Sequence, residues 1–397
     1  MDLPKGIGPF TINKLYAHFS RKLHFLIKFI HSSDLHLGKP FGRFPEDVRV
    51  RLRLARAAVL QKLAALAKSH DASHILLAGD TFDQMTPAPS VVRQALNSMG
   101  AAEHVSWILM PGNHDHTNAT ELWRQVAQDA PANVVLALDP EPIVLNAETV
   151  LLPAPPTERH PGRDLTDWFD DAATSQKIRI GLAHGSVTDF NSSEEGGSSV
   201  IAPDRARRAQ LNYLGLGDWH GQLQIGPETW YSGAPEADGF KHDHTPSALL
   251  VEIAAANAPA KVTSLPTGTI RWRRAALDLM GVEDCSAALA DILPPLPKRQ
   301  LTLFDLVVTG RAGPVDRVAL EKETAKVAPD FLWHRADFGQ LGLDHDTSDL
   351  DMIDRQGAMR AAAETLALEV ADENLPPEQR KTGHAALSIL FSLALEA

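Results

Sequence analysis

Apolar and polar positions follow one another along this chain in a pattern that predicts strands and helices in turn. Short, nearly continuous apolar runs are typical of strands buried on both faces, and runs of this kind end near residues 31, 78, 110, 182 and 216. Between them, apolar residues recur at helical spacing over 45–69, 89–99 and 121–127. This alternation predicts an α/β fold.

Each of the five apolar runs is followed by a short polar cluster. The clusters are Asp34-Leu35-His36, Gly79-Asp80-Thr81-Phe82-Asp83, Gly112-Asn113-His114-Asp115, Ala183-His184-Gly185 and Gly217-Asp218-Trp219-His220. Residues just past the carboxyl ends of strands converge on one edge of a sheet, which is the usual ligand site in α/β folds. The neighbouring glycines suit turns where the backbone bends sharply or passes close to a ligand. We therefore expect the five clusters to form one site.

The side chains in these clusters indicate the chemistry of that site. Asp, His and Asn are ligands for hard or borderline divalent metals. Two metals about 3.5–4 Å apart neutralise a phosphate ester and lower the pKa of a bound water, so they allow a weak nucleophile to attack an anion. A single Asp-x-His or Gly-Asp-x-x-Asp is typical of a solvated turn. The prediction of a two-metal centre depends on all five clusters occurring in this order.

In this order, the clusters resemble those of the calcineurin-like metallophosphoesterase superfamily. The stretch 33–38, Ser-Asp-Leu-His-Leu-Gly, resembles its DNA-repair nuclease branch, the SbcD and YhaO-type exonucleases. The resemblance covers about residues 28–280 and extends more faintly to about 340. It implies a two-sheet αββα sandwich with a small α+β capping domain and a C-terminal helical tail.

The resemblance also implies roles for individual residues. His114 would lie over the scissile phosphate and assist the departing oxygen while a metal-bridging hydroxide attacks phosphorus. Asp115 would orient His114, and Asp83 stands beside the ligands where relatives often carry His. The implied metal ligands are Asp34, His36 and His220 at the first ion, Asp80 between the two ions, and Asn113 and His184 at the second.

One cluster departs from the family pattern. The family usually has Gly-His-x-His where this chain has Gly217-Asp218-Trp219-His220. Because a carboxylate is a competent ligand, we expect Asp218 to replace the missing imidazole at the second metal. The alternative is contact through water, which would leave the second site weak. The added negative charge favours harder ions, so we predict two Mn²⁺ ions, with Mg²⁺, Fe²⁺ and Zn²⁺ as alternatives.

Charge and composition bear on the substrate. The net charge of −12 counts against a nucleic-acid partner, because nucleic-acid binders are more often basic. A local run of arginines over 43–56 follows the first cluster closely and offers phosphate contacts, of which Arg43 and Arg49 are the candidates. His116 directly follows the third cluster and is a further candidate for substrate binding. The alternative for these residues is a solvated surface.

The sequence also predicts how the chain is organised. The parts are a poorly ordered extension over 1–27, a catalytic domain over 28–280, a capping domain over 281–340, and a linker with helices over 341–397. The strand expected at 269–277 would complete the catalytic core, and the polar segment 190–199 would form a mobile loop beside the site. The resemblance implies that the C-terminal helices bind an SMC-like coiled-coil ATPase. The alternative is that they pack on their own domain.

Together these observations predict a cytoplasmic hydrolase, namely a two-metal phosphodiesterase that acts on DNA as an exonuclease or endonuclease in DNA repair. The single cysteine, Cys285, allows no internal disulfide, and no apolar run reaches the length of a membrane span. Relatives often form homodimers. One alternative is a phosphodiesterase or phosphatase that acts on a nucleotide or another small molecule. A second is a degenerate metal site that serves as a scaffold for a partner ATPase.

Overall fold

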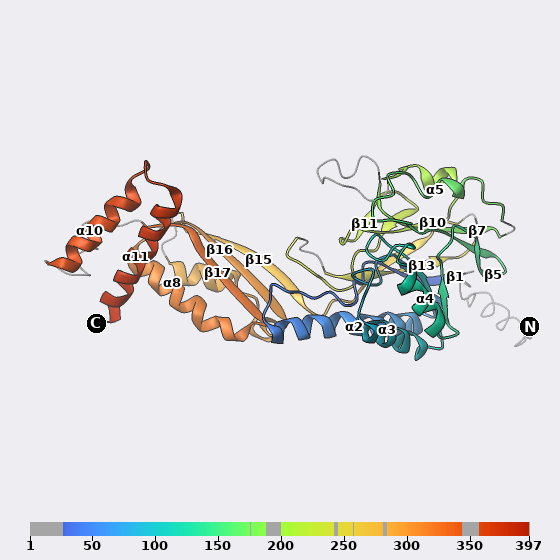
Figure 1. Cartoon of the computed structure of the whole chain (residues 1–397), viewed down its shortest axis with the longest axis horizontal. Coiled ribbons are helices and arrows are strands. Elements are labelled where there is room, and N and C mark those ends of the chain that lie inside the picture. Colours follow the sequence, from blue (N-terminus) through green and yellow to red (C-terminus); the bar gives the residue numbers. More distant parts are fainter. Residues whose placement is uncertain are drawn as a thin grey trace, which may run out of the picture. The chain divides into compact units, whose positions relative to one another are not determined.

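The computed structural model of the chain describes residues 27–174, 176–187, 200–241, 245–256, 258–280, 284–343 and 357–396 (Figure 1). The expectations for the N-terminal extension before residue 27, for the loop at 190–199 and for most of the linker after 341 lie outside these ranges. The chain divides into two compact units. The first unit comprises 1–237 and 244–268, and the second comprises 238–243 and 269–397.

The first unit contains two six-stranded sheets. Strands β1 to β4 of the first sheet run parallel, whereas β13 runs antiparallel to both of its neighbours, β1 and β14. The order in that sheet is β14 (Lys261–Pro266), β13 (Ser247–Ile253), β1 (Ile27–Ser32), β2 (His74–Ala78), β3 (Ser106–Met110) and β4 (Val134–Leu136).

In the second sheet, β12, β10, β7 and β6 run parallel, with antiparallel strands at both edges. The order is β11 (Leu223–Gln224), β12 (Thr229–Tyr231), β10 (Tyr213–Gly217), β7 (Ile178–His184), β6 (Thr149–Ala154) and β5 (Ile143–Asn146). Two short strands, β8 (Ser186–Val187) and β9 (Val200–Ile201), form a separate pair.

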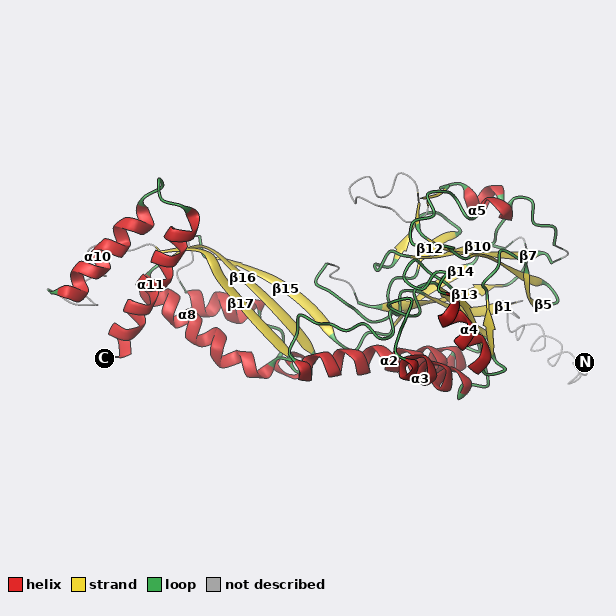
Figure 2. Cartoon of the chain, in the orientation of Figure 1, coloured by secondary structure: helices red, strands yellow, loops and turns green. Residues whose placement is uncertain are grey.

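Alternating side chains of the strands build the layers of the first unit. In β2, Ile75 and Leu77 pack under the helices, while Leu76 packs toward the second sheet with Ile180 and Tyr213. The first sheet is covered by α2 (Glu46–Ser69), α3 (Pro89–Gly100) and α4 (Thr120–Asp129), and α5 (Arg205–Arg208) and the 3₁₀ turn η1 (Asp167–Phe169) lie over the second (Figure 2). The predicted αββα sandwich is confirmed, as are the three predicted helices.

The second unit has a parallel three-stranded sheet of its own. Its order is β15 (Arg271–Asp278), β16 (Thr302–Ala312) and β17 (Trp333–Leu343), and its helical elements are α6 (Cys285–Ile292), α7 (Leu296–Arg299), α8 (Pro314–Val327) and η2 (Ala328–Asp330). The prediction that the strand at 269–277 completes the two-sheet core is wrong, because β15 pairs with β16 and its Leu277 packs with Phe304 and Leu306. Strand β16, helix α8 and strand β17 follow one another in the chain, and β16 and β17 are parallel neighbours.

The chain ends in two helices, α10 (Ala358–Ala371) and α11 (Pro377–Glu396). The fully buried Leu387 of α11 packs against Ala363 of α10 and Val318 of α8, so α11 packs on its own unit. Leu368 and Ile389 remain 73% and 60% exposed. Among the helices of the described ranges, none is long and apolar enough to cross a membrane.

Candidate metal centre

The five polar clusters follow strands that end at the facing edges of the two sheets. Three clusters follow the parallel strands β1, β2 and β3 of the first sheet, and the other two accompany β7 and β10 of the second. Because these strands are parallel within each sheet, their carboxyl ends lie together. The structure thus brings into one place the residues that the sequence pattern selected.

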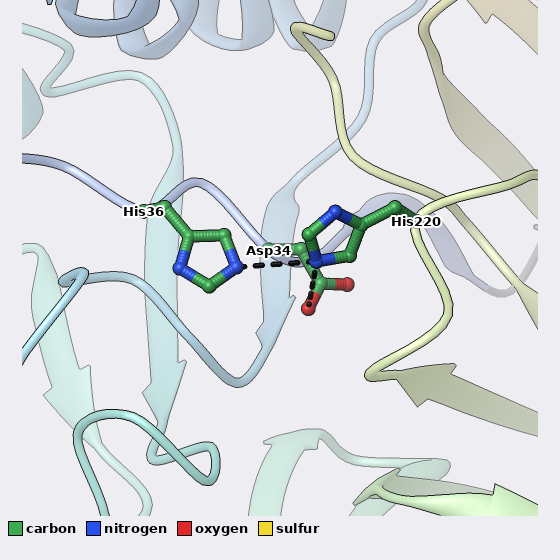
Figure 3. A group of neighbouring side chains, drawn as sticks. All are labelled: Asp34, His36 and His220. Carbon is green, nitrogen blue, oxygen red and sulfur yellow. Dashed lines mark hydrogen bonds and ion pairs between the residues drawn. The ribbon is translucent and has the colours of Figure 1, made fainter. Parts of the chain in front are cut away.

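Three groups of carboxylate and imidazole atoms form the centre, and within each group the ligand atoms all lie within 4.8 Å of one another. Figure 3 shows the first group, in which His36 Nε2 is 3.2 Å from His220 Nε2, and His220 Nε2 is 3.8 Å from Asp34 Oδ1. The groups are Asp34, His36 and His220; His36, Asp80 and His114; and Asp34, Asp80 and His184. Shared members join the three groups into one continuous cluster.

Asp80 lies between the two halves of this cluster. Its Oδ2 is 3.6 Å from His36 Nε2 and also 3.6 Å from His184 Nε2. Its other oxygen, Oδ1, accepts a hydrogen bond from the backbone N–H of His114 at 2.8 Å. One carboxylate oxygen therefore faces two imidazoles that come from different sheets.

Hydrogen bonds at Nδ1 fix the orientation of the imidazole rings. The Nδ1–H of His184 donates to the carbonyl of Ala78 at 2.8 Å, and the Nδ1–H of His114 donates to the carbonyl of Asp83 at the same distance. His36 Nδ1 lies 3.3 Å from the Asp83 carboxylate. A proton held at Nδ1 leaves Nε2 as the nitrogen that can bind a metal.

Three buried polar atoms of the proposed ligands have no hydrogen-bond partner within the described ranges, namely His36 Nδ1, His184 Nε2 and Asn113 Oδ1. The first lies beside the Asp83 carboxylate. Unpaired buried polar atoms are costly in a folded protein, and a bound cation would satisfy the other two. With the surrounding carboxylates and imidazoles, they make a donor set that fits divalent metals.

Crowded carboxylates and burial shift the pKa values in the centre. Burial raises the pKa of Asp80 to about 7, where the positive charge of His184 opposes the shift and the negative charge of Asp34 adds to it. Burial disfavours the cationic form of His184, but the charges of Asp80 and Asp34 outweigh it and raise the pKa. Burial lowers the pKa of His36 well below its usual value, so its imidazole is neutral and can act as a ligand.

The backbone that carries these residues is strained. Asp34, His36, Asp80 and Asp218 have positive φ angles of 56°, 44°, 53° and 96°. Residues other than glycine seldom adopt this left-handed region, and such strain concentrates at functional sites. Gly79 has a φ of 90°, and a Cβ there would lie 2.2 Å from His184 Nδ1, so the predicted need for glycine at this turn is confirmed.

The structure corrects the predicted role of Asp115. Its carboxylate accepts hydrogen bonds from the backbone N–H groups of Phe82 at 2.9 Å and Gly112 at 2.6 Å, so it joins the second cluster to the third. The ring of His114 is held instead by the carbonyl of Asp83. The prediction that Asp115 orients His114 is wrong, because the two neighbouring side chains point to different partners. Burial raises the pKa of Asp115 to about 7, and the charge of Asp80 adds to this shift.

The candidates for substrate binding lie at the surface or beside other loops. Arg49 pairs with Glu46 on its own helix, and the guanidinium of Arg43 lies 4.8 Å from the ring centre of Phe44. His116 is near Glu158 and Arg159, and burial lowers its pKa. None of the three belongs to the groups that form the centre. Their contact with a substrate stays a prediction.

Arg56 is a supporting residue that sequence reasoning missed. It belongs to the arginine run considered for phosphate contacts, yet it is 2% exposed. Its guanidinium donates to the carbonyls of Asp34 and Leu35 and, at 3.0 Å, to that of Glu236. A signal was present, because position 56 falls on the same helical stripe as the buried residues 52, 59 and 63.

Comparisons with known proteins agree with this geometry. Residues 27–220 match the family model of the calcineurin-like phosphoesterase. The chain is 23% identical over 280 residues to the uncharacterized metallophosphoesterase YhaO of Bacillus subtilis (strain 168), covering 66% of this chain and 65% of the relative. It is 24% identical over 252 residues to the SbcD component of the SbcCD nuclease of the same organism, covering 54% and 63%. The chain thus spans just under two thirds of the length of these relatives.

A solved structure, that of TT1561 from Thermus thermophilus, aligns with 61% of this chain and 99% of its own, at 12% identity and a TM-score of 0.41.

Replacing Arg56 by methionine should destabilise the protein strongly. Three buried carbonyls would lose their donors, so we expect the free energy of unfolding to fall by about 3 kcal/mol or more in urea titrations. Arg53→Met is the matched control, because Arg53 lies on the same helix but is solvent-exposed and pairs with Glu46. The control should change stability by less than about 0.5 kcal/mol. Equal losses in the two variants would contradict the supporting role.

Metal affinity should fall as the pH is lowered below about 7. The pKa of Asp80 is raised to about 7, so its carboxyl group is increasingly protonated below that pH, and a divalent cation must displace this proton. The raised pKa of His184 acts in the same direction. We expect the affinity for Mn²⁺ to fall about tenfold per pH unit for each proton displaced. Calorimetric titrations between pH 5.5 and 8 measure this slope, and a flat profile would contradict it.

Proposed function

Because residues 27–220 match the model of the calcineurin-like phosphoesterase family, we propose that this protein is a two-metal phosphodiesterase that cleaves DNA. One observation carries the proposal, namely the single oxygen of Asp80 that lies 3.6 Å from an imidazole nitrogen on either side. A carboxylate oxygen in that position suits a bridge between two cations. The family match supports a hydrolase of phosphate esters that uses divalent metals. That the substrate is DNA is our proposal beyond this match.

The proposed ligands divide into two sets. When bound, the two metals neutralise the phosphate oxygens and lower the pKa of an attacking water. We propose Mn²⁺, because the proposed ligands include carboxylate and amide oxygens and no cysteine sulfur. The ligands are Asp34, His36 and His220 for the first ion, Asp80 for both, and Asn113 and His184 for the second.

His114 is the proposed proton-transfer residue. Its Nδ1–H is held by the carbonyl of Asp83, so Nε2 is the atom that can hold a proton for the departing sugar oxygen. Its ring lies 4.8 Å from that of His36, edge to face, so this group stands beside the proposed first metal. Asp83 therefore supports both rings, through its carbonyl at His114 and its carboxylate near His36.

The proposal of DNA as substrate rests on the similarity to a relative named as part of a nuclease, at 24% identity. The net charge of −12 favours a different substrate, a small phosphodiester or phosphate monoester, because an acidic surface repels a polyanion. The two candidates use the same metal centre. They differ in whether the enzyme cleaves DNA, which is a polymer, or only a small phosphate ester.

His114→Ala should leave two metals bound and lower the rate of diester cleavage by about 100-fold or more, because a general acid typically contributes this much. The assay uses end-labelled single- and double-stranded DNA with Mn²⁺, Mg²⁺ or chelator, beside a chromogenic diester. The matched control is His104→Ala, since His104 bonds the carbonyl of Ala64, away from the centre. Full turnover in the His114 variant would refute its role.

The same assay separates the candidate substrates. Cleavage of DNA that depends on Mn²⁺ and is lost in His114→Ala supports the nuclease. Hydrolysis of the chromogenic diester alone moves the substrate to a small molecule. Fewer than two ions per chain, with no turnover on either substrate, would indicate a degenerate site that serves as a scaffold.

Asp80→Asn should abolish the binding of both metals. The amide keeps the size of the side chain but removes the charge between the two imidazoles, so each ion loses a shared ligand. Metal content after dialysis, measured by mass spectrometry, should fall from two ions per chain to fewer than one. Retention of two ions would contradict the assignment of Asp80 as the ligand shared by both ions.

A further inference from the structure

Asp218 stands at the centre, but its carboxylate lies outside the three groups of potential ligand atoms. Its Oδ1 accepts a hydrogen bond from Asn113 Nδ2 at 2.9 Å and lies 3.8 Å from His184 Nε2. Its Oδ2 accepts from Ser186 Oγ at 3.3 Å. Each oxygen of this carboxylate therefore already has a hydrogen-bond donor.

The bond from Asn113 decides which way its amide faces. A side-chain amide is planar, with its oxygen and nitrogen on opposite sides. With Nδ2 held by Asp218, Oδ1 points away from Asp218, and this oxygen is buried without a hydrogen-bond partner in the described part of the chain. The free acceptor of Asn113 is thus set by its contact with Asp218.

The backbone of Asp218 is held in place as well. Its N–H donates to the two carboxylate oxygens of Asp34 at 3.3 and 3.2 Å, and its φ angle is 96°. A residue other than glycine adopts this angle only where its surroundings enforce it. Asp218 therefore contacts a proposed ligand of the first metal through its backbone and one of the second through its side chain.

We propose that Asp218 is a positioning residue, which holds the Asn113 amide so that Oδ1 and not Nδ2 faces the second metal. This inference rests on the two-metal function proposed above. The second ion then has three protein ligands, Asp80, Asn113 and His184, whereas the first has four. The second ion consequently binds more weakly and exchanges more readily than the first. Direct ligation by Asp218, as predicted from the sequence, is the alternative that the experiment must separate.

A pair of uncharged variants tests the hydrogen bond. Asp218→Asn and Asp218→Leu have similar volume and both remove the charge, but only the asparagine carbonyl can still accept from Asn113. In Mn²⁺ titrations of the full chain, we expect the leucine variant to bind the second ion 10- to 100-fold more weakly than the asparagine variant, as for other partners of metal ligands. The first ion should bind alike in both. Equal affinities for the second ion would overturn the proposal.

A cysteine substitution tests direct ligation. Co²⁺ bound to a thiolate gives a charge-transfer absorption that oxygen and nitrogen ligands do not give. In a Cys285→Ala background, which removes the native thiol, we expect this absorption for Asn113→Cys, because position 113 supplies a ligand. We expect none for Asp218→Cys. The absorption in the Asp218 variant would make position 218 a ligand and overturn the positioning role.

The unaltered chain separates this inference from the function on which it rests. Two Mn²⁺ ions of unequal affinity in the wild type agree with both. Fewer than two ions would contradict the two-metal function itself, whatever the variants do. Two ions of equal affinity would leave that function standing and count against the positioning role.

Discussion

The structure depends on one electrostatic constraint, which is that several carboxylates share a buried place where the edges of two sheets meet. Asp34 and Asp80 are almost fully buried, and burial raises the pKa of Asp80, with the charge of Asp34 adding to the shift. Like charges in a low-dielectric interior repel strongly, so a fold with these groups gains most when cations bind among them. The backbone strain, the oriented imidazoles and the unpaired polar atoms are all consistent with a site arranged for such ions. The same buried carboxylates therefore account both for these structural features and for the proposed binding of metals.

Holding that site together requires contacts that the ligands cannot supply themselves. Arg56 binds the carbonyls of the first cluster and that of Glu236, which lies beyond β12 of the other sheet. Asp115 binds backbone amides of two further clusters. A buried side chain with fixed hydrogen bonds allows little movement, so the loops keep their left-handed turns. These residues act on the chemistry only through the geometry they preserve.

The strand-end clusters could be predicted from the sequence because two local signals coincide in them. An apolar run marks each strand, and a cluster of Asp, His or Asn residues follows it. The other features depend on contacts between distant segments. The orientation of Asp115 follows from amides at positions 82 and 112, and the pairing of β15 with β16 follows from a core that its own alternation does not reveal. Arg56 was visible as part of a buried helical stripe, but its charge suggested the surface instead.

Asp218 shows how one substitution can redistribute roles within a single arrangement of ligand types. A shorter, anionic side chain at this position can bind a neighbouring amide, and in the structure its oxygens contact Asn113 and Ser186. On the assignment proposed above, such a site would keep the orientation of its ligands and give up one bond to the second ion. The first ion would be held by two imidazoles and two carboxylates, so the two ions would bind with unequal affinity. A second ion that exchanges readily would couple the binding of metal to the arrival of an anionic substrate, since each would stabilise the other in the same place.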